Sequence, residues 1–73
     1  MIKELERVAL TRDLPHLGLK AGDVGTVVLE HHGKGYEVEF VSLEGETMAV
    51  VSLTVDDVRR IRPREIANAR PMG

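Results

Sequence analysis

The adjacent residues His31 and His32 are the first candidates for chemistry, as ligands of a metal ion. Imidazole nitrogens bind zinc and related metals, but successive side chains of an extended strand point to opposite faces. Neighbouring histidines therefore do not readily hold one ion. His16 would join them only if the loop that carries it folded against their hairpin. We expect a solvated hairpin tip here, with no metal site and no other cofactor.

Asp56 and Asp57 form a second pair, of a type that suits acid–base chemistry. Glycosidase-like carboxylates must converge from roughly 5 to 10 Å apart across a cleft, and a domain this small has little room for one. Asp57 instead stands three residues after Thr54, the spacing of a capping box, so capping of a short turn is expected. Ser42 and Ser52 have no base or nucleophile-elbow motif beside them. We therefore expect no catalytic residues and no enzyme.

A cluster of arginines near the C-terminal end is the most prominent charged feature: Arg59, Arg60, Arg62 and Arg64. On a strand Arg60 and Arg62 share a face, and phosphate contacts from that face would make nucleic-acid binding strongly salt-dependent. The other interpretation is a solvated edge, or pairing within the chain with the acidic strand that contains Glu37 and Glu39. Few aromatic residues are present, so base stacking has no platform.

Length and composition limit the kinds of protein this chain can be. Its 73 residues suffice for one domain, and the absence of cysteine excludes disulfides and thiolate chemistry. Residues 1–57 hold five Lys or Arg against eleven Asp or Glu, whereas residues 58–73 hold five Arg against one Glu. A broad cationic footprint for nucleic acid is thus missing. With no signal-peptide pattern and no apolar run near the ~18 residues of a membrane span, a cytoplasmic protein without membrane contact is expected.

Short strands are the elements that must position these residues. The clearest is the segment YEVEF, which places one tyrosine, one valine and one phenylalanine on one face and two glutamates on the other. Hydrophobic alternation and β-branched residues predict five strands, over residues 7–11, 25–29, 36–40, 47–53 and 58–61.

The connections between the strands carry their own signals. The first loop, residues 12–21, contains three leucines and is expected to fold back over one end of a barrel. Gly25 precedes a burst of valines, where a Cβ atom would collide with a neighbouring strand, so a bulge or a close approach is expected. A 3₁₀ turn is predicted at Thr54–Asp57, and Pro63 ends the last strand.

The predicted fold class is therefore all-β. We expect a small, partly open, five-stranded antiparallel barrel of the SH3-like kind over residues 1–63, with the 3₁₀ turn before its last strand. Residues 64–73 are expected to form a short C-terminal tail that is flexible or partly helical.

Two resemblances support this fold. The segments TRDLPHLGLKAGDVGTVV and GYEVEF, with a likeness that continues to about Arg62, resemble a small bacterial family known as domain of unknown function 4926. The family implies an SH3-like barrel and no assigned activity. More distantly, Asp23–Val27 followed by Val51–Val58 is similar to the KOW-type barrels of transcription elongation factors and ribosomal proteins, and to the barrel of the nitrile hydratase β-subunit.

We expect the chain to be a non-catalytic protein-interaction module, for example the antitoxin-like or immunity-like partner of a protein encoded nearby. An exposed sheet edge would pair with a strand of the partner or of a second copy. The alternative is a KOW-like nucleic-acid-binding barrel that uses its C-terminal arginines. Binding contacts are predicted on the first loop, the first hairpin and the last strand, at Arg12, His16, His31, His32, Arg59, Arg60 and Arg62.

Overall fold

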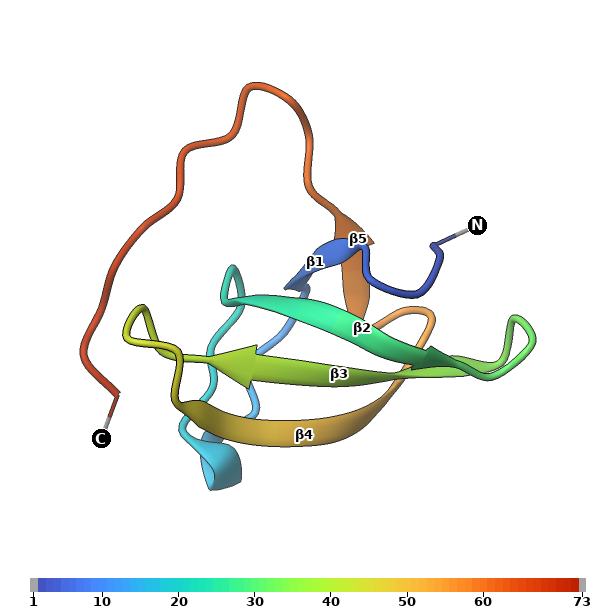
Figure 1. Ribbon diagram of the computed structural model, residues 1–73, viewed down its shortest axis with the longest axis horizontal. Coiled ribbons are helices and arrows are strands. Elements are labelled where there is room, and N and C mark those ends of the chain that lie inside the picture. Colours follow the sequence, from blue (N-terminus) through green and yellow to red (C-terminus); the bar gives the residue numbers. More distant parts are fainter. Residues whose placement is uncertain (1, 73) are drawn as a thin grey trace.

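Within residues 2–72, which the computed structural model describes, five strands pair into one open antiparallel sheet (Figure 1). The predicted division into a barrel and a tail begins at Met1 and ends at Gly73, and these two residues lie outside the described range. The strand order is β4-β3-β2-β1-β5, so β4 and β5 form the two edges. The all-β class and the five antiparallel strands are confirmed. The elements are β1 (Arg7–Leu10), the 3₁₀ helix η1 (Pro15–Leu17), β2 (Val24–Glu30), β3 (Gly35–Val41), β4 (Thr47–Thr54) and β5 (Val58–Arg60).

One hydrophobic core forms on the inner face of this sheet. The alternation in β3 acts as predicted, because Tyr36, Val38 and Phe40 are buried while the glutamates between them face outward. Each of the five strands contributes to the core, as does the first loop. The core residues are Val8, Leu10, Leu14, Leu19, Val27, Tyr36, Val38, Phe40, Leu53 and Val58.

The first loop folds back onto the core, as its leucines predict. Leu14 and Leu19 are both buried and form an isolated antiparallel bridge, in which the Leu14 N–H donates to the Leu19 carbonyl at 2.8 Å. Pro15 begins η1 between them and Gly18, at φ +71°, ends it. Proline suits a first helical position because its φ is fixed near the helical value, and glycine adopts the left-handed region without strain.

The single turn predicted before the last strand is present. At Thr54–Asp57 the Asp57 N–H donates to the Thr54 carbonyl at 3.1 Å, which is the i→i+3 bond of one 3₁₀ turn, and the 3₁₀ helix η1 in the first loop was not predicted. No second helical turn follows because Val58 already pairs with Leu10 of β1. The predicted capping contact is present, since the Thr54 N–H donates to Asp57 Oδ2 at 3.0 Å.

Gly25 is the site of close approach that its sequence context predicts. A Cβ atom at this position would lie 2.6 Å from Val38 Cγ1 and 2.9 Å from Phe40 Cε1, well inside van der Waals contact. The register shift of β2 against β3 falls three residues later, between Val27 and Leu29. Glycine at position 25 therefore lets β2 and β3 pack closely while the strand bends.

Residues 61–72, which we call the C-terminal arm, have no regular secondary structure. The arm leaves β5, arcs away from the sheet and returns along its side (Figure 1). Arg70 anchors the far end by donating from Nε to Asp23 Oδ1 at 2.8 Å and from Nη2 to the Gly18 carbonyl at 2.9 Å. No helix within residues 2–72 has the length and apolar character needed to cross a membrane.

Candidate functional site

The predicted binding residues lie in separate parts of the molecule. His16 is exposed on η1, while His31 and His32 lie in the hairpin between β2 and β3. Arg59, Arg60 and Arg62 lie on β5 or just after it, on the side of the molecule away from η1 (Figure 1). The structure does not bring these groups together into one site.

The arginines of β5 are engaged within the chain. Arg59 forms a two-pronged ion pair with Glu65, with Nη1–Oε1 and Nη2–Oε2 distances of 2.7 Å. Arg60 Nε lies 3.1 Å from Glu6 Oε2. These arginines therefore form ion pairs within the chain, as one of the two interpretations predicted. The prediction that the acidic strand of residues 37–39 would supply their partners is wrong. The Arg59 guanidinium lowers the pKa of the Glu65 carboxyl to about 2.

Arg12 is tied to the turn before β5. Its Nε donates to Asp57 Oδ1 at 2.7 Å, and Asp57 is buried while also accepting the Thr54 N–H. The hydrogen bond from Arg12, followed by that from Thr54, lowers the pKa of Asp57 below its ordinary value. These contacts join the first loop to the last turn, so Arg12 has a structural role.

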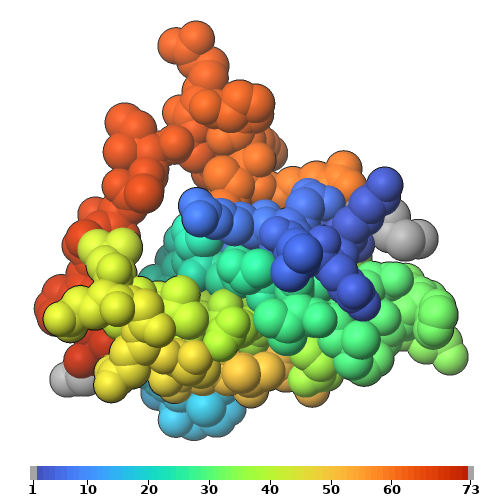
Figure 2. All heavy atoms as spheres, viewed as in Figure 1, coloured from blue at the N-terminus to red at the C-terminus, as the bar shows by residue number. Residues whose placement is uncertain are grey.

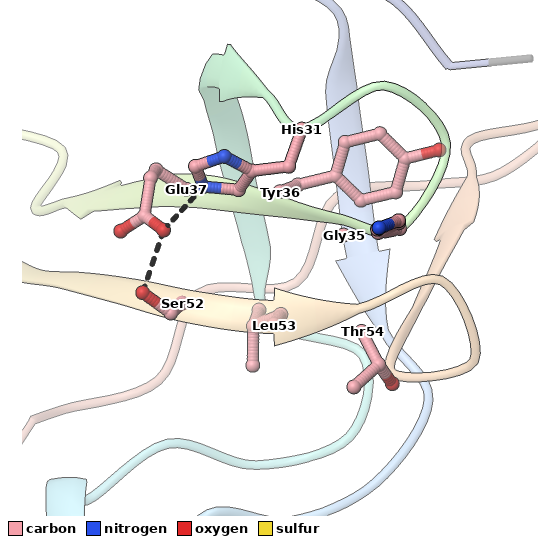
Figure 3. Close-up of a pocket in the computed structure, with 8 residues that line it drawn as sticks. His31, Gly35, Tyr36, Glu37, Ser52, Leu53 and Thr54 are labelled. Atoms are coloured by element: carbon pink, nitrogen blue, oxygen red, sulfur yellow. Dashed lines mark hydrogen bonds and ion pairs between the residues drawn. The ribbon is translucent and has the colours of Figure 1, made fainter.

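A shallow hollow of about 350 Å³ lies between the first hairpin and the end of β4 (Figure 3). Glu37 lines one side of it, and its Oε2 accepts hydrogen bonds from Ser52 Oγ at 2.6 Å and from His31 Nε2 at 2.8 Å. The Ser52 hydroxyl, followed by the His31 imidazole, lowers the pKa of Glu37. Sequence reasoning missed this cluster, although Glu37 and Ser52 both lie on the outer faces of neighbouring strands and pair directly in register.

The chemistry of this cluster follows from the order of its members. A nucleophilic serine needs a base that takes its proton, with a third group that orients the base. Here the carboxylate stands between the serine and the imidazole, and its lowered pKa makes it a weak base. The arrangement fixes His31 and β4 against β3 and supplies no activated nucleophile. Within residues 2–72 no three His, Cys, Asp or Glu side chains gather to hold a metal ion.

The outer edge of β4 is a candidate binding surface that the sequence analysis did not identify. β4 reads TMAVVSLT and contains no charged residue and no proline over its eight positions. Its register with β3 is unbroken from the Phe40–Ala49 pair to the Gly35–Thr54 pair. The other edge strand, β5, has three residues and two of them are arginines. The signal was available in the uncharged run, but only the strand order shows that this run forms an edge.

Apolar side chains surround this edge. Met48 and Val50 are 38% and 58% exposed on the outward face of β4, and Val41 and Leu43 are 48% and 94% exposed beside its start. We call β4 with Val41 and Leu43 the β4 edge surface. In Figure 2, β3 and β4 lie at the front of the molecule, open to solvent. These exposed apolar side chains lie next to one another along one edge of the sheet.

Acidic residues border the β4 edge surface. Glu39 lies opposite Val50 on β3, and Glu37 lies opposite Ser52. Glu44 and Glu46 are exposed in the turn that leads into β4. The edge itself is neutral, while the charged residues that border it are negative.

Comparison with known proteins gives a family for this chain. The family model described as Domain of unknown function (DUF4926) matches residues 4–60, which include all five strands. Searches of curated proteins and of solved structures found no match. The match spans most of the chain and ends where the C-terminal arm begins. The chain therefore belongs to the DUF4926 family.

Proposed function

We propose that this protein is a non-catalytic protein-interaction module that takes up an extended segment of a second protein as a sixth strand along β4. Strand addition of this kind supplies affinity through backbone hydrogen bonds and specificity through alternate side chains. A partner strand would meet Met48 and Val50 on the outer face of the sheet. On the inner face it would cover Ala49 and Val51, which are half-buried at the margin of the core.

The observation that carries this proposal is the unprotected edge of β4. Edge strands in natural proteins are kept from pairing by short length, by charged side chains, by proline or by covering segments. β5 is short and carries two arginines, whereas β4 has eight residues and no charged side chain. An eight-residue edge with exposed Met48 and Val50 is suited to pairing with another strand.

The charges near β4 indicate the chemistry of the partner. A segment with apolar residues at alternate positions would match Met48 and Val50, and flanking Lys or Arg residues would face Glu44 and Glu46. A second copy of the chain fits less well. Antiparallel pairing of two β4 strands would bring Glu46 of one copy close to Asp56 of the other, which places like charges together.

Affinity capture from a lysate of the source cell tests the proposal with a matched pair of variants. Val50→Lys places a charge in the middle of the β4 edge, on a side chain that already faces solvent, so the fold is expected to survive. Ile66→Lys makes the same kind of change on the C-terminal arm, at a side chain that is 93% exposed. We expect the wild-type protein and Ile66→Lys to retain one protein in stoichiometric amount and Val50→Lys to lose it.

Two results would contradict the proposal. One is equal capture by Val50→Lys and by the wild-type protein. The other is recovery of nucleic acid alone, at low salt, that disappears with the double change Arg60→Glu and Arg62→Glu. Circular dichroism of each variant shows whether its fold is intact.

A further inference from the structure

A second surface, unrelated to the β4 edge, lies beneath the C-terminal arm. A cleft of about 570 Å³ separates the arm from the outer face of the sheet, and Figure 2 shows the opening between the arm and the body. β1, β2 and β5 form its floor, the segment 20–23 forms one side, and the arm forms the roof. This volume falls within the range of roughly 300 to 1,000 Å³ found for small-molecule sites.

Side chains of three neighbouring strands form the floor of the cleft. Ala9 of β1 pairs with Val24 on one side and with Arg59 on the other, so these three residues lie side by side. Ala9 has the shortest side chain of the three and is 3% exposed, so it lies at the bottom of the row, below its longer neighbours. Val24, Ile61 and Ile66 line the cleft and are 44%, 36% and 93% exposed. A ligand with an apolar body would cover side chains that now face solvent.

The two ends of the cleft are closed by ion pairs. Arg59 binds Glu65 at the base of the arm, and Arg70 binds Asp23 at its far end. The hydrogen bonds from Arg70 are the main cause of the lowered pKa of Asp23, so this carboxyl is charged at neutral pH. Both carboxylates that line the cleft are thus neutralised by arginines of the same cleft.

Two further cations line the cleft without such partners. Neither Arg7 nor Lys20 forms a close ion pair within residues 2–72, although the charge of Lys20 contributes to the lowered pKa of Asp23. Arg7 lies on β1 two residues before Ala9, and hence on the same outer face of the sheet. The cleft has a net charge of +2 from its four cations and two carboxylates, although the whole chain has a net charge of −2. Net positive charge and exposed apolar side chains therefore occur together in this cleft.

We propose that this cleft binds a small organic carboxylate with an apolar body. The carboxylate would lie near Arg7 and Lys20, and the apolar body would cover Ala9, Val24 and Ile61 beneath the arm. A purely inorganic anion would leave the apolar floor exposed, and a neutral apolar molecule would leave both cations without a partner. The site is independent of strand addition at β4.

Titration with octanoate, followed by amide NMR shifts, tests this proposal directly. We expect saturable shifts at Ala9, Val24 and Ala67 and none along β4. Octan-1-ol has the same apolar body without the charge, and acetate has the charge without the body. Each is expected to bind at least about tenfold more weakly than octanoate, since a tenfold change corresponds to the loss of about one favourable interaction.

Three variants separate charge from shape. The double change Arg7→Glu and Lys20→Glu is expected to weaken octanoate binding by about tenfold or more, because both favourable charges become repulsive. Lys34→Glu, in the first hairpin, is the matched control and is expected to leave binding unchanged. Ala9→Leu enlarges the side chain at the floor of the cleft without a change of charge and is expected to abolish binding while the fold, checked by circular dichroism, is retained.

Three results would overturn the proposal. They are binding of octan-1-ol or acetate as tight as that of octanoate, shifts that do not saturate or that fall outside the cleft, and equal effects of Lys34→Glu and the double change. If Ala9→Leu does not fold, the charge variants still decide the question.

Discussion

Asp57 is the residue whose replacement tests most clearly how the first loop is held to the last strand. Its buried carboxylate accepts hydrogen bonds from Arg12 Nε at 2.7 Å and from the Thr54 N–H at 3.0 Å. Asp57→Asn keeps the shape of the side chain but removes its charge, and its single oxygen can accept only one of the two hydrogen bonds. Hydrogen bonds to a charged group contribute about 1.5 to 3 kcal/mol each, and the amide retains part of this, so we expect a loss of about 2 kcal/mol.

In a domain of this size, about 2 kcal/mol corresponds to a fall in Tm of roughly 8 to 16 °C. Thermal unfolding followed by circular dichroism at pH 7 measures this change. Asp56→Asn is the matched control, because Asp56 is the adjacent and exposed acid of the same turn. We expect the control to change stability by less than about 0.5 kcal/mol.

The pH dependence follows from the sign of the pKa shift. The pKa of Asp57 is lowered in the folded protein, so its stabilising effect is present above the unfolded-state value near 3.8 and is lost as the pH falls through the folded value. The difference in Tm between the wild-type protein and Asp57→Asn is thus expected to be constant from pH 5 to 8 and to shrink below pH 3.8. Equal losses in Asp56→Asn and Asp57→Asn, or a difference undiminished in acid, would refute the reasoning.

Gly25→Ala is expected to destabilise the fold by about 1 to 3 kcal/mol, because the new methyl group would lie 2.6 Å from Val38 Cγ1; chemical denaturation measures this, and an unchanged midpoint would contradict it. Arg70→Ala is expected to release the C-terminal arm, because the arm loses its contacts with Asp23 and Gly18; faster amide exchange confined to residues 61–72 would confirm this, and unchanged exchange would contradict it. Acidification is expected to weaken the base of the arm: the stabilising effect of the pair between Glu65 and Arg59 is complete above the ordinary pKa of 4.5 and is lost as the pH falls to the folded pKa of Glu65, about 2, where the carboxyl becomes protonated; NMR titration of the Glu65 carboxyl measures this pKa, and an ordinary value would contradict the prediction.

The fold was predictable where the signal is local. The alternation of Tyr36, Val38 and Phe40 follows from the two-residue period of a strand, and it determines which face is buried. The close approach at Gly25 followed from a glycine within a β-branched run. The leucines of the first loop were too numerous for a solvated segment, and two of them are buried in the core.

The contacts of the charged residues were not predictable, because they depend on where distant segments return. Arg70 meets Asp23 across 47 positions, and Arg12 meets Asp57 across 45. The prediction that the arginines of β5 would pair with the acids of β3 is wrong because the chain brings Glu65 and Glu6 closer to them. The 3₁₀ helix in the first loop was not predicted, although Pro15 at its first position and Gly18 at its end were visible signals for it.

For β4, the uncharged run was visible in the sequence, but the position of this strand at the edge of the sheet was not. The sequence shows an uncharged run over residues 47–54. Such a run is equally typical of a central strand, where neighbours on both sides satisfy its backbone. Only the strand order, which places β4 at one end of the sheet, turns the same residues into an open edge.

Hydrogen–deuterium exchange of the protein, alone and with the protein that it captures, tests strand addition most directly. In the free protein, the backbone N–H groups on the outer side of β4 are expected to exchange rapidly. In the complex, we expect these amides of Thr47–Thr54 to become protected at alternate positions, with no comparable change in β5. Protection at the first loop, at the hairpin that holds His31 or at β5, with β4 unchanged, would contradict the account.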